Sequence, residues 1–541
     1  MLPLLLAVTG FLGWFLYRFL RPASPLAKVP GPRVGSWLSG HVSKMSARDA
    51  FGFFRMLDNV YGAIAKVKGP FSKDWLYVYD PTAIYSILSK DQASWDELEW
   101  FTQGNNYFLG PGLIGVAGET HRKQRKMLHP AFSTKHVAEM TLTFYEVTDK
   151  LVAALMKRVD DGPKVIDVLS WTGRTALELI AQAGIGHSFD PLVDDNTPDT
   201  FAAAVKQFVP LFFVPETMMY HQLITVLRKM GLPSVARWCV NYSPLRTIRE
   251  LRDVSNTLHD KSSEVIRQKK AALQDGELGT GKDIISILLK ANSAASDRDK
   301  LPDDELVAQV STLLFAATDT TSNALARALH VLCEHPVAQS KLRQEILAAR
   351  DGSDLTYDAL HALPYLDAVC KETLRWSVTT PFLLRIAYRD TTLPFSQPIR
   401  GTDGSSIESV FIPKGTIAVM SLSAYNRNKA LWGEDADEWK PERWLVPLPR
   451  AVEETPNPGV YAHLMSFLGG GRSCIGFKFS LLEMKVVLTL LLANFTFELS
   501  PDKPVVWNHS GVIYPSLGKS SSKPEMWLKV DKYRGATQAT G

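Results

Sequence analysis

Near its C-terminal end the chain places a cysteine inside a glycine-rich loop, in the stretch SFLGGGRSCIGFKFS at residues 466–480. Cys474 is one of only four cysteines in 541 residues, and the largely apolar run 475–495 that begins directly after it predicts a long helix. A cysteine at a helix N-terminus feels the positive end of the helix dipole and unpaired backbone N–H groups, which lower the pKa of its thiol. The loop therefore predicts a thiolate that acts as a nucleophile or as a metal ligand.

The rest of the sequence limits the roles that this thiolate can have. A nucleophile needs a histidine base, and the sequence assigns none to this loop. The four cysteines are far apart and form no CxxC pair, which argues against zinc and against a disulfide framework and fits a reducing compartment. A single thiolate suits the axial position of a haem iron, because the porphyrin supplies the other four ligands.

The same loop resembles the signature F-x-x-G-x-R-x-C-x-G of the cytochrome P-450 superfamily, which it matches at every fixed position. Those positions are Phe467, Gly470, Arg472, Cys474 and Gly476. The resemblance covers nearly the whole chain and implies a mainly α cytochrome P-450 fold, a large helical domain with a minor β portion. It also implies haem b as the cofactor, Cys474 as the iron ligand, and the other four residues of the signature as part of the haem site.

A second resemblance lies in KETLRW, where Glu372 and Arg375 are three residues apart on one helix face. In the family, such an E-x-x-R pair forms a buried triad with an arginine of a downstream PERW segment, here Arg443 in KPERW. An E-x-x-R pair alone is common on solvated helix faces, and only the order of the three motifs makes it specific. The triad is expected to be structural, because a buried charge that loses its partner costs about 3–5 kcal/mol.

The stretch LLFAATDTTS at residues 313–322 resembles the long central helix of the family. Asp319 and Thr320 are then the catalytic acid–alcohol pair, since a hydroxyl backed by a carboxylate can deliver protons to bound dioxygen. The alternative is that both side chains only make local hydrogen bonds within a helix. One departure is Ala317, which stands where the family usually has glycine and is expected to alter the local helix geometry.

The haem carboxylates are expected to be held by basic side chains. In GETHRKQRKMLHPAFS, residues 118–133, His121 and Arg125 lie four residues apart on one helix face, although the family often has tryptophan at the first of these positions. By resemblance, Arg385 and Arg472 supply further contacts to the propionates. The alternative for residues 118–133 is a solvated basic helix.

Electrons are implied to come from NADPH through a membrane-bound FAD/FMN reductase, with cytochrome b5 as a further partner. Four basic residues are candidates for docking an acidic redox partner, with plain surface charge as the alternative: Arg122, Lys123, Lys126 and Lys478. The net charge of +4 and the lack of a basic stripe argue against nucleic-acid binding.

The N-terminal stretch MLPLLLAVTGFLGWFLY carries no charged side chain and, extended to residue 20, approaches the thickness of a bilayer core. It predicts a transmembrane anchor at residues 1–20, a proline-rich hinge at 21–35 and a catalytic domain at 36–541. Basic residues follow the apolar run, which predicts a single-pass protein of the endoplasmic reticulum membrane whose body faces the cytosol. The alternative is a cleaved signal peptide, but a basic n-region and a cleavage site are not evident.

Periodicity predicts a β-hairpin at 61–80, helices at 134–160, 167–184, 244–270 and 303–333, a polar linker at 271–283, and strands near 408–420 and the C-terminus. The apolar stretch 208–221 predicts either a buried turn or a surface patch. By resemblance, the walls of a pocket come from 96–115, 208–221, 314–317, 379–384 and 510–514, which are rich in Phe, Leu and Tyr.

The implied activity is insertion of one oxygen atom from dioxygen into a lipophilic small molecule. The chain looks most like fungal microsomal members, many of which oxidise terpenoids in secondary metabolism. Two alternatives remain at this stage. One is a haem-thiolate isomerase or dehydratase that does not use dioxygen, and the other is a non-enzymatic, membrane-tethered haem sensor.

Overall fold

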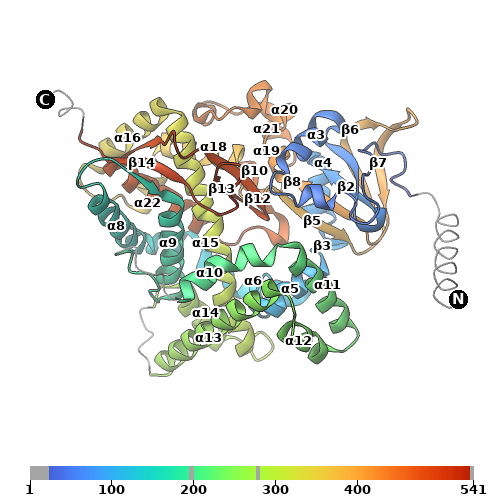
Figure 1. Ribbon diagram of the computed structural model, residues 1–541, viewed down its shortest axis with the longest axis horizontal. Coiled ribbons are helices and arrows are strands. Elements are labelled where there is room, and N and C mark those ends of the chain that lie inside the picture. The colour runs from blue at the N-terminus through green and yellow to red at the C-terminus, as the bar shows by residue number, and fades with distance from the viewer. Residues whose placement is uncertain (1–23, 194–199, 276–280, 536–541) are drawn as a thin grey trace.

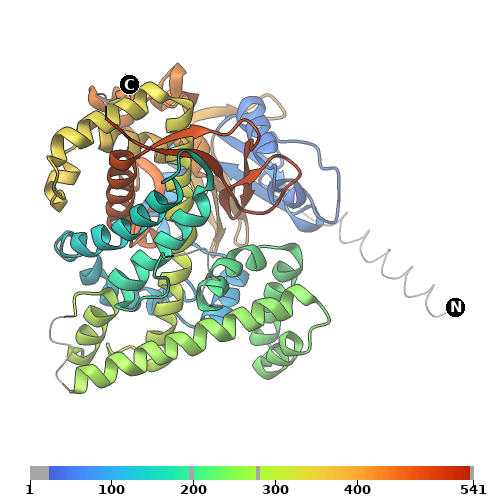
Figure 2. The same cartoon turned by 60° about the vertical axis from the view of Figure 1, so that its left-hand side comes forward.

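The computed structural model describes residues 24–193, 200–275 and 281–535 (Figure 1). Helices form most of it and strands a smaller part, as predicted. The strands β1, β2, β5 and β8 gather with α3 and α4 on one side, and the long helices occupy the other side and the base in both views (Figures 1 and 2). One large hydrophobic core includes residues from Leu26 to Val530, so it draws on nearly the whole described chain.

Two helices form the centre of the helical part. The helix α15 (Asp303–Glu334) begins with three acidic residues, which favour a helix N-terminus. It packs against α9 (Val168–Leu179), α13 (Arg246–Gln274) and α22 (Phe477–Asn494). The helix α22 is buried along nearly its whole length, which explains why its sequence is apolar on all sides.

The remaining helices surround this centre. They are α2 (Val42–Met45), α3 (Phe51–Tyr61), α4 (Pro81–Tyr85), α5 (Glu99–Leu109), α6 (Gly118–Leu128), α7 (Thr134–Glu139), α8 (Thr141–Arg158), α10 (Thr200–Phe212), α11 (Pro215–Lys229), α12 (Pro233–Asn241), α14 (Ile284–Ala294), α16 (Pro336–Arg350), α17 (Tyr357–His361), α18 (Pro364–Trp376), α19 (Leu422–Asn426), α20 (Lys429–Trp432) and α21 (Arg450–Glu454).

The main sheet has five strands in the order β1-β2-β8-β5-β3. They are β1 (Ile64–Lys68), β2 (Asp74–Val78), β8 (Ile417–Ser421), β5 (Phe382–Ala387) and β3 (Trp95–Asp96). The predicted hairpin at 61–80 is confirmed by antiparallel pairing of β1 with β2, and β8 joins β2 in parallel. The sheet therefore brings residues 74–78 and 382–387 together although they are far apart in the sequence.

The other strands form small sheets. A three-stranded sheet has the order β11-β14-β4, and three pairs are β6–β7, β9–β10 and β12–β13. Their bounds are β4 (Lys164–Asp167), β6 (Thr391–Arg400), β7 (Ser406–Ile412), β9 (Gly459–Tyr461), β10 (Leu464–Gly469), β11 (Phe495–Leu499), β12 (Val505–Ser510), β13 (Val512–Leu517) and β14 (Trp527–Lys532).

Two predicted boundaries and one predicted turn differ from the structure. The predicted helix 134–160 is two helices, α7 and α8, with Met140 between them. Residues 271–274 belong to α13 and not to the polar linker, because the helix pattern continues past the predicted end. Residues 208–221 are not a turn but mostly the end of α10 and the start of α11, in which Phe208 and Phe212 are fully buried and Met219 is exposed.

The described end of the predicted hinge packs on the body. Leu26 and Val29 are buried in the core, and the backbone N–H of Lys66 donates to the carbonyl oxygen of Pro30. A Cβ on Gly31 would lie 1.9 Å from the carbonyl oxygen of Lys66, so only glycine permits this close approach to β1. The predicted anchor at 1–20 lies outside the described residues, and within them no helix is long and apolar enough to cross a bilayer.

Candidate active site

A cavity of about 1550 Å³ lies between α15, the Cys474 loop, β5 and the β12–β13 hairpin. It is lined by Cys474 on one side and by Ala316, Asp319 and Thr320 of α15 on another. All five predicted wall segments contribute aromatic or branched apolar side chains, for example Phe101, Phe213, Phe315, Leu383 and Val512. The cavity therefore combines a thiol, an acid–alcohol pair and a largely apolar surface.

The loop that carries Cys474 is shaped by two left-handed backbone positions, at Leu468 (φ 57°) and Gly470 (φ 69°). The backbone N–H of Cys474 donates to the carbonyl oxygen of Phe467 at 2.9 Å and closes the turn. A Cβ on Gly470 would lie 1.9 Å from the carbonyl oxygen of Leu88. Glycine is required at 470 because another backbone segment lies against it, and not because this residue must approach a ligand.

The thiol of Cys474 does not have the low pKa that its place before a helix predicts. Cys474 is accessible through the cavity, yet the surrounding protein desolvates it, and this burial raises the pKa of the thiol. The backbone N–H of Gly476 and the charge of Arg125 lower the pKa and do not outweigh burial. A bound metal reverses this balance, because a coordinating thiol is deprotonated outright.

Basic side chains converge beside the Cys474 loop. Arg125 on α6 donates to Ser473, from Nη1 to the carbonyl oxygen at 2.7 Å and from Nη2 to Oγ at 2.9 Å. Arg472 donates from Nη2 to Asp96 Oδ1 at 3.0 Å and from Nη1 to the carbonyl oxygen of Val116 at 3.0 Å. The structure thus brings Arg125 and Arg472 to one place from segments 347 residues apart in number.

Arg385 on β5 is buried, lines the cavity, and has an unsatisfied nitrogen. Its Nη1 donates to the carbonyl oxygen of Leu384, whereas its Nη2 has no hydrogen-bond partner and lies 3.7 Å from Glu97 Oε1. A buried guanidinium nitrogen without a partner is costly unless a further acceptor satisfies it. The carboxylate of a haem propionate is such an acceptor.

His121 on α6 is buried beside these arginines. Burial, followed by the positive charges of Arg472 and Arg125, lowers the pKa of His121 to about 3. The imidazole is therefore neutral at physiological pH and can donate one hydrogen bond, but it adds no positive charge for a carboxylate. Arg125 is the stronger of the two predicted contacts on α6.

These residues fit a haem. Cys474 would supply a sulfur ligand to the iron, Arg385 would supply a buried donor that has no partner in the protein, and Arg472 lines the same cavity. The other signature residues lie around the thiol. Phe467 lines the cavity and packs 6.0 Å from Phe477 between ring centroids, while Gly476 precedes α22 and directs its N–H to the sulfur.

The acid–alcohol pair lies on a regular part of α15. Thr320 donates its hydroxyl proton to the carbonyl oxygen of Ala316 at 2.8 Å, which is the local hydrogen bond of the alternative interpretation. Both Asp319 and Thr320 also line the cavity. The local hydrogen bond of Thr320 is therefore compatible with a position of the pair beside the cavity. At Ala317 the helix continues without a bulge.

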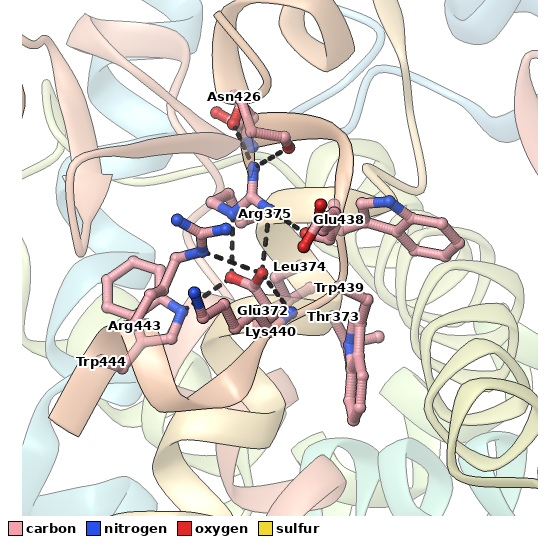
Figure 3. Close-up of polar contacts among 12 residues, drawn as sticks. Glu372, Thr373, Leu374, Arg375, Asn426, Glu438, Trp439, Lys440, Arg443 and Trp444 are labelled. Carbon is pink, nitrogen blue, oxygen red and sulfur yellow. Dashed lines mark hydrogen bonds and ion pairs between the residues drawn. The ribbon is translucent and has the colours of Figure 1, made fainter. Parts of the chain in front are cut away.

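The predicted triad is confirmed (Figure 3). Arg375 donates to both carboxylate oxygens of Glu372 at 2.8 Å, and Arg443 donates from Nε to Glu372 Oε1 at 3.0 Å. The indole of Trp444 and the backbone N–H of Lys440 add two more bonds to the same carboxylate. Glu372 and Arg375 are fully buried, and every oxygen of the carboxylate is satisfied.

The chain matches a known protein family over nearly its whole length. The family model described as Cytochrome P450 matches residues 29–519. The chain belongs to the cytochrome P450 family. The signature loop, the buried triad and the acid–alcohol pair of this P450 all lie within the matched residues.

Similar proteins cover nearly the whole chain. Cytochrome P450 monooxygenase 91 of Postia placenta is 46% identical and covers 96% of this chain and 97% of its own. A ganoderic acid synthetase of Ganoderma lucidum is 45% identical and covers 97% and 98%. A crystal structure of a cytochrome P450 shares the fold with a TM-score of 0.70 at 22% identity, covering 94% of this chain and 99% of that one. This P450 is a haem-thiolate monooxygenase of the same family.

Two buried polar residues near the cavity of this P450 were missed by sequence reasoning. His509 lines the cavity beside Phe382, and its Nδ1 has no hydrogen-bond partner. Arg327 on α15 lies between the rings of Trp376 and Trp507, 4.5 Å from each centroid, and so joins α15 to α18 and β12. No short motif could have revealed Arg327, since its partners are 49 and 180 residues away in the sequence.

The helix α11, which contributes Met218 and Gln222 to the lining of the cavity, carries a further buried histidine. His221 on α11 packs 4.3 Å from Phe212 and 6.0 Å from Trp100 between ring centroids, and neither ring nitrogen has a hydrogen-bond partner. Burial lowers the pKa of His221 to about 4. The folded state therefore holds the neutral imidazole over a pH range in which the unfolded chain is protonated.

Replacing His221 with leucine is expected to make folding less sensitive to acid. Because the pKa is lower in the folded state, stability from this site is present above about pH 6.5 and falls as pH drops toward 4. The shift corresponds to roughly 3 kcal/mol at about 1.4 kcal/mol per pKa unit. Urea unfolding at pH 7 and pH 5 should show about 2 kcal/mol of this difference, because pH 5 still lies above the pKa of the folded state. The idea fails if the loss of stability between these two values is the same in H221L and the parent.

Proposed function

We propose that this P450 is a membrane-anchored monooxygenase that oxidises a lipophilic small molecule, a terpenoid or related compound of fungal secondary metabolism. The observation that carries the proposal is the single cavity in which Cys474 and the Asp319–Thr320 pair share apolar walls. An acid–alcohol pair serves a reaction that consumes protons and dioxygen, which disfavours an isomerase or dehydratase. Haem, when bound, supplies the activation of dioxygen.

The other roles, which are haem binding, proton transfer and substrate orientation, are assigned to residues of the chain. Cys474 would hold the iron, and Arg125, Arg385, Arg472 and neutral His121 would hold the propionates by hydrogen bonds. Thr320 would pass a proton from Asp319 toward the cavity after its hydroxyl leaves the carbonyl oxygen of Ala316. The apolar walls would orient the substrate and exclude water.

The substrate class is supported by the walls and by one relative. The cavity is lined mainly by aromatic and aliphatic side chains, which suits a large apolar molecule. A relative with 45% identity over nearly the whole chain is named for ganoderic acid, a terpenoid. A panel of terpenoids is therefore the first set of substrates to test.

A position of this P450 at a membrane is supported by the residues that line one part of the cavity. Its lining includes Ser24, Pro25 and Leu26, the first described residues after the predicted anchor, and the exposed Phe71. We propose residues 1–20 as a single-pass anchor in the endoplasmic reticulum membrane, 21–35 as the connection, and 36–541 as the catalytic domain facing the cytosol. A lipophilic substrate would then enter from the bilayer side.

Electrons would come from NADPH through a FAD/FMN reductase, with cytochrome b5 as a second donor. P450 monooxygenases generally use such redox partners. Of the candidate docking residues, Arg122 and Lys126 are exposed, and Arg122 pairs with Glu119. Lys123 and Lys478 bind protein oxygens, at the carbonyl of Lys300 and the hydroxyl of Thr134. Arg122 and Lys126 are thus the better candidates for docking.

The proposal is tested with microsomes that contain the full chain and a reductase. We expect at least one terpenoid of a panel to accelerate NADPH consumption and to give an oxygenated product. Products from charged, hydrophilic compounds alone would contradict the proposed substrate class. Products that form without NADPH and reductase would instead favour an isomerase or dehydratase.

Replacing Thr320 with alanine is expected to slow product formation by about 10²-fold and to divert NADPH electrons to hydrogen peroxide. The reason is that the hydroxyl is the group proposed to deliver the proton, and general acid–base groups contribute about 10²–10⁴-fold. Product and peroxide are measured per NADPH consumed. The matched control is Thr320→Ser, which keeps the hydroxyl and should stay closer to the parent. Equal coupling in T320A and the parent would refute the relay.

A further inference from the structure

A second cavity, of about 500 Å³, lies between α5, α11, α12 and the first turns of α13. None of its lining residues lines the catalytic cavity. Both views place these helices together at one corner of the molecule, below the five-stranded sheet (Figures 1 and 2). This second cavity is called the arginine pocket below, after three of its lining residues, Arg228, Arg237 and Arg252.

The arginine pocket is strongly basic. Among the residues that line it in the described chain there is no aspartate or glutamate. Tyr107 also lines the pocket, and although burial raises the pKa of its phenol, Arg237, Arg228 and Arg252 all act to lower it. The three guanidinium groups therefore act on one common point, which is the phenol oxygen of Tyr107 at the pocket wall.

Two of the arginines are held in place and the third is available. Arg228 donates from Nη1 to Asn106 Oδ1 at 2.9 Å, and Arg252 donates from Nη1 to the carbonyl oxygen of Asn241 at 2.8 Å. Arg252 also donates to Asp253 Oδ1, so that carboxylate offsets part of its charge. Arg237 is exposed and makes no hydrogen bond or ion pair with the described residues. The pocket thus has free donors and an excess of positive charge.

Exposed apolar side chains lie on and next to α12, four of whose residues line the arginine pocket. Met230 is 65% exposed, Trp238 on α12 is 62% exposed, and Tyr242 is 72% exposed. Leu232 and Val235 are exposed beside them. Exposed apolar side chains gathered around a basic site indicate a ligand with both an anionic group and an apolar part.

We propose that the arginine pocket binds the phosphate group of an anionic phospholipid. Arginine matches phosphate well, because its planar fork donates two parallel hydrogen bonds to two oxygens. The exposed apolar residues on and next to α12 would contact the hydrocarbon region beside the headgroup. Free inorganic phosphate shares the anionic chemistry but gives no reason for the exposed Trp238 and Met230.

The proposal is tested by calorimetric titration of the full, haem-loaded chain in a non-ionic detergent. The probes are dihexanoyl phosphatidic acid, dihexanoyl phosphatidylcholine and inorganic phosphate. We expect saturable binding of the phosphatidic acid, at least ~10-fold tighter than that of the other two. The triple variant R228Q/R237Q/R252Q should weaken this binding by at least ~10-fold.

The control variant is Arg246→Gln, which removes an exposed charge from the start of α13 outside the pocket and should change binding less than ~2-fold. If the triple variant fails to bind haem, R237Q alone decides. Arg237 makes no hydrogen bond or ion pair within the described part of the chain, and its loss should weaken binding by ~3-fold or more. Unchanged binding in R237Q would overturn the proposal. Equal affinity for inorganic phosphate or phosphatidylcholine would overturn the assignment to an anionic lipid.

Discussion

Replacing Cys474 with serine is expected to abolish the strongly red-shifted Soret band of the reduced, CO-treated protein and to reduce turnover by at least about 10²-fold. The band reports a thiolate ligand, and a serine hydroxyl does not replace it. Cys474 is the only cysteine that lines the catalytic cavity among those described. Absorbance spectra of the reduced protein with and without CO, together with NADPH-dependent product formation, measure both effects.

The matched control for this substitution is Cys239→Ser, because Cys239 is a half-buried free cysteine on α12. C239S should keep both the band and turnover. A red-shifted band in C474S would show that the sulfur ligand comes from elsewhere. Loss of the band in C239S as well would mean that the loss reports general damage to the fold.

Replacing Glu372 with glutamine is expected to lower the free energy of unfolding by about 3–5 kcal/mol. Glutamine keeps the volume of the side chain, so the effect isolates the charge. The buried guanidinium groups of Arg375 and Arg443 would then face a neutral amide, one of whose ends donates instead of accepting. The midpoint of urea unfolding and the fraction of chain that retains haem measure the effect.

The control for the triad is Glu119→Gln, which breaks an exposed Glu–Arg pair with the same spacing along its helix. That pair contributes less than about 1 kcal/mol because water solvates both partners. Similar unfolding midpoints for E372Q and E119Q would contradict the structural role of the triad. If E372Q keeps the parent's unfolding midpoint but loses activity, Glu372 takes part in the reaction and not in stability.

Much of the fold could be predicted because its signals are local. The apolar period of residues 303–334 and the GP turn of the β1–β2 hairpin each depend on neighbouring residues. The triad was predictable only by resemblance, from the order of its motifs, because the spacing of Glu372 and Arg375 alone is common on solvated helix faces. The break at Met140 was missed because both sides of it have the same helical pattern.

Residues of the site could be predicted only where they belong to a short sequence motif. The thiol of Cys474 shows the limit, since its local position predicts a low pKa and burial by distant segments raises it. The contacts of Arg472 with Asp96 and of Arg327 with two tryptophans join segments that no sequence spacing relates. The arginine pocket likewise combines residues from four helices.

The most direct test of monooxygenase activity is to trace where the new oxygen atom in the product comes from. The full chain and a reductase are incubated with NADPH, an accepted terpenoid and isotopically labelled dioxygen, and the product is analysed by mass spectrometry. The account predicts a product that gains one labelled oxygen atom, only when NADPH is present. A product of unchanged mass, or one whose new oxygen comes from water, would contradict it.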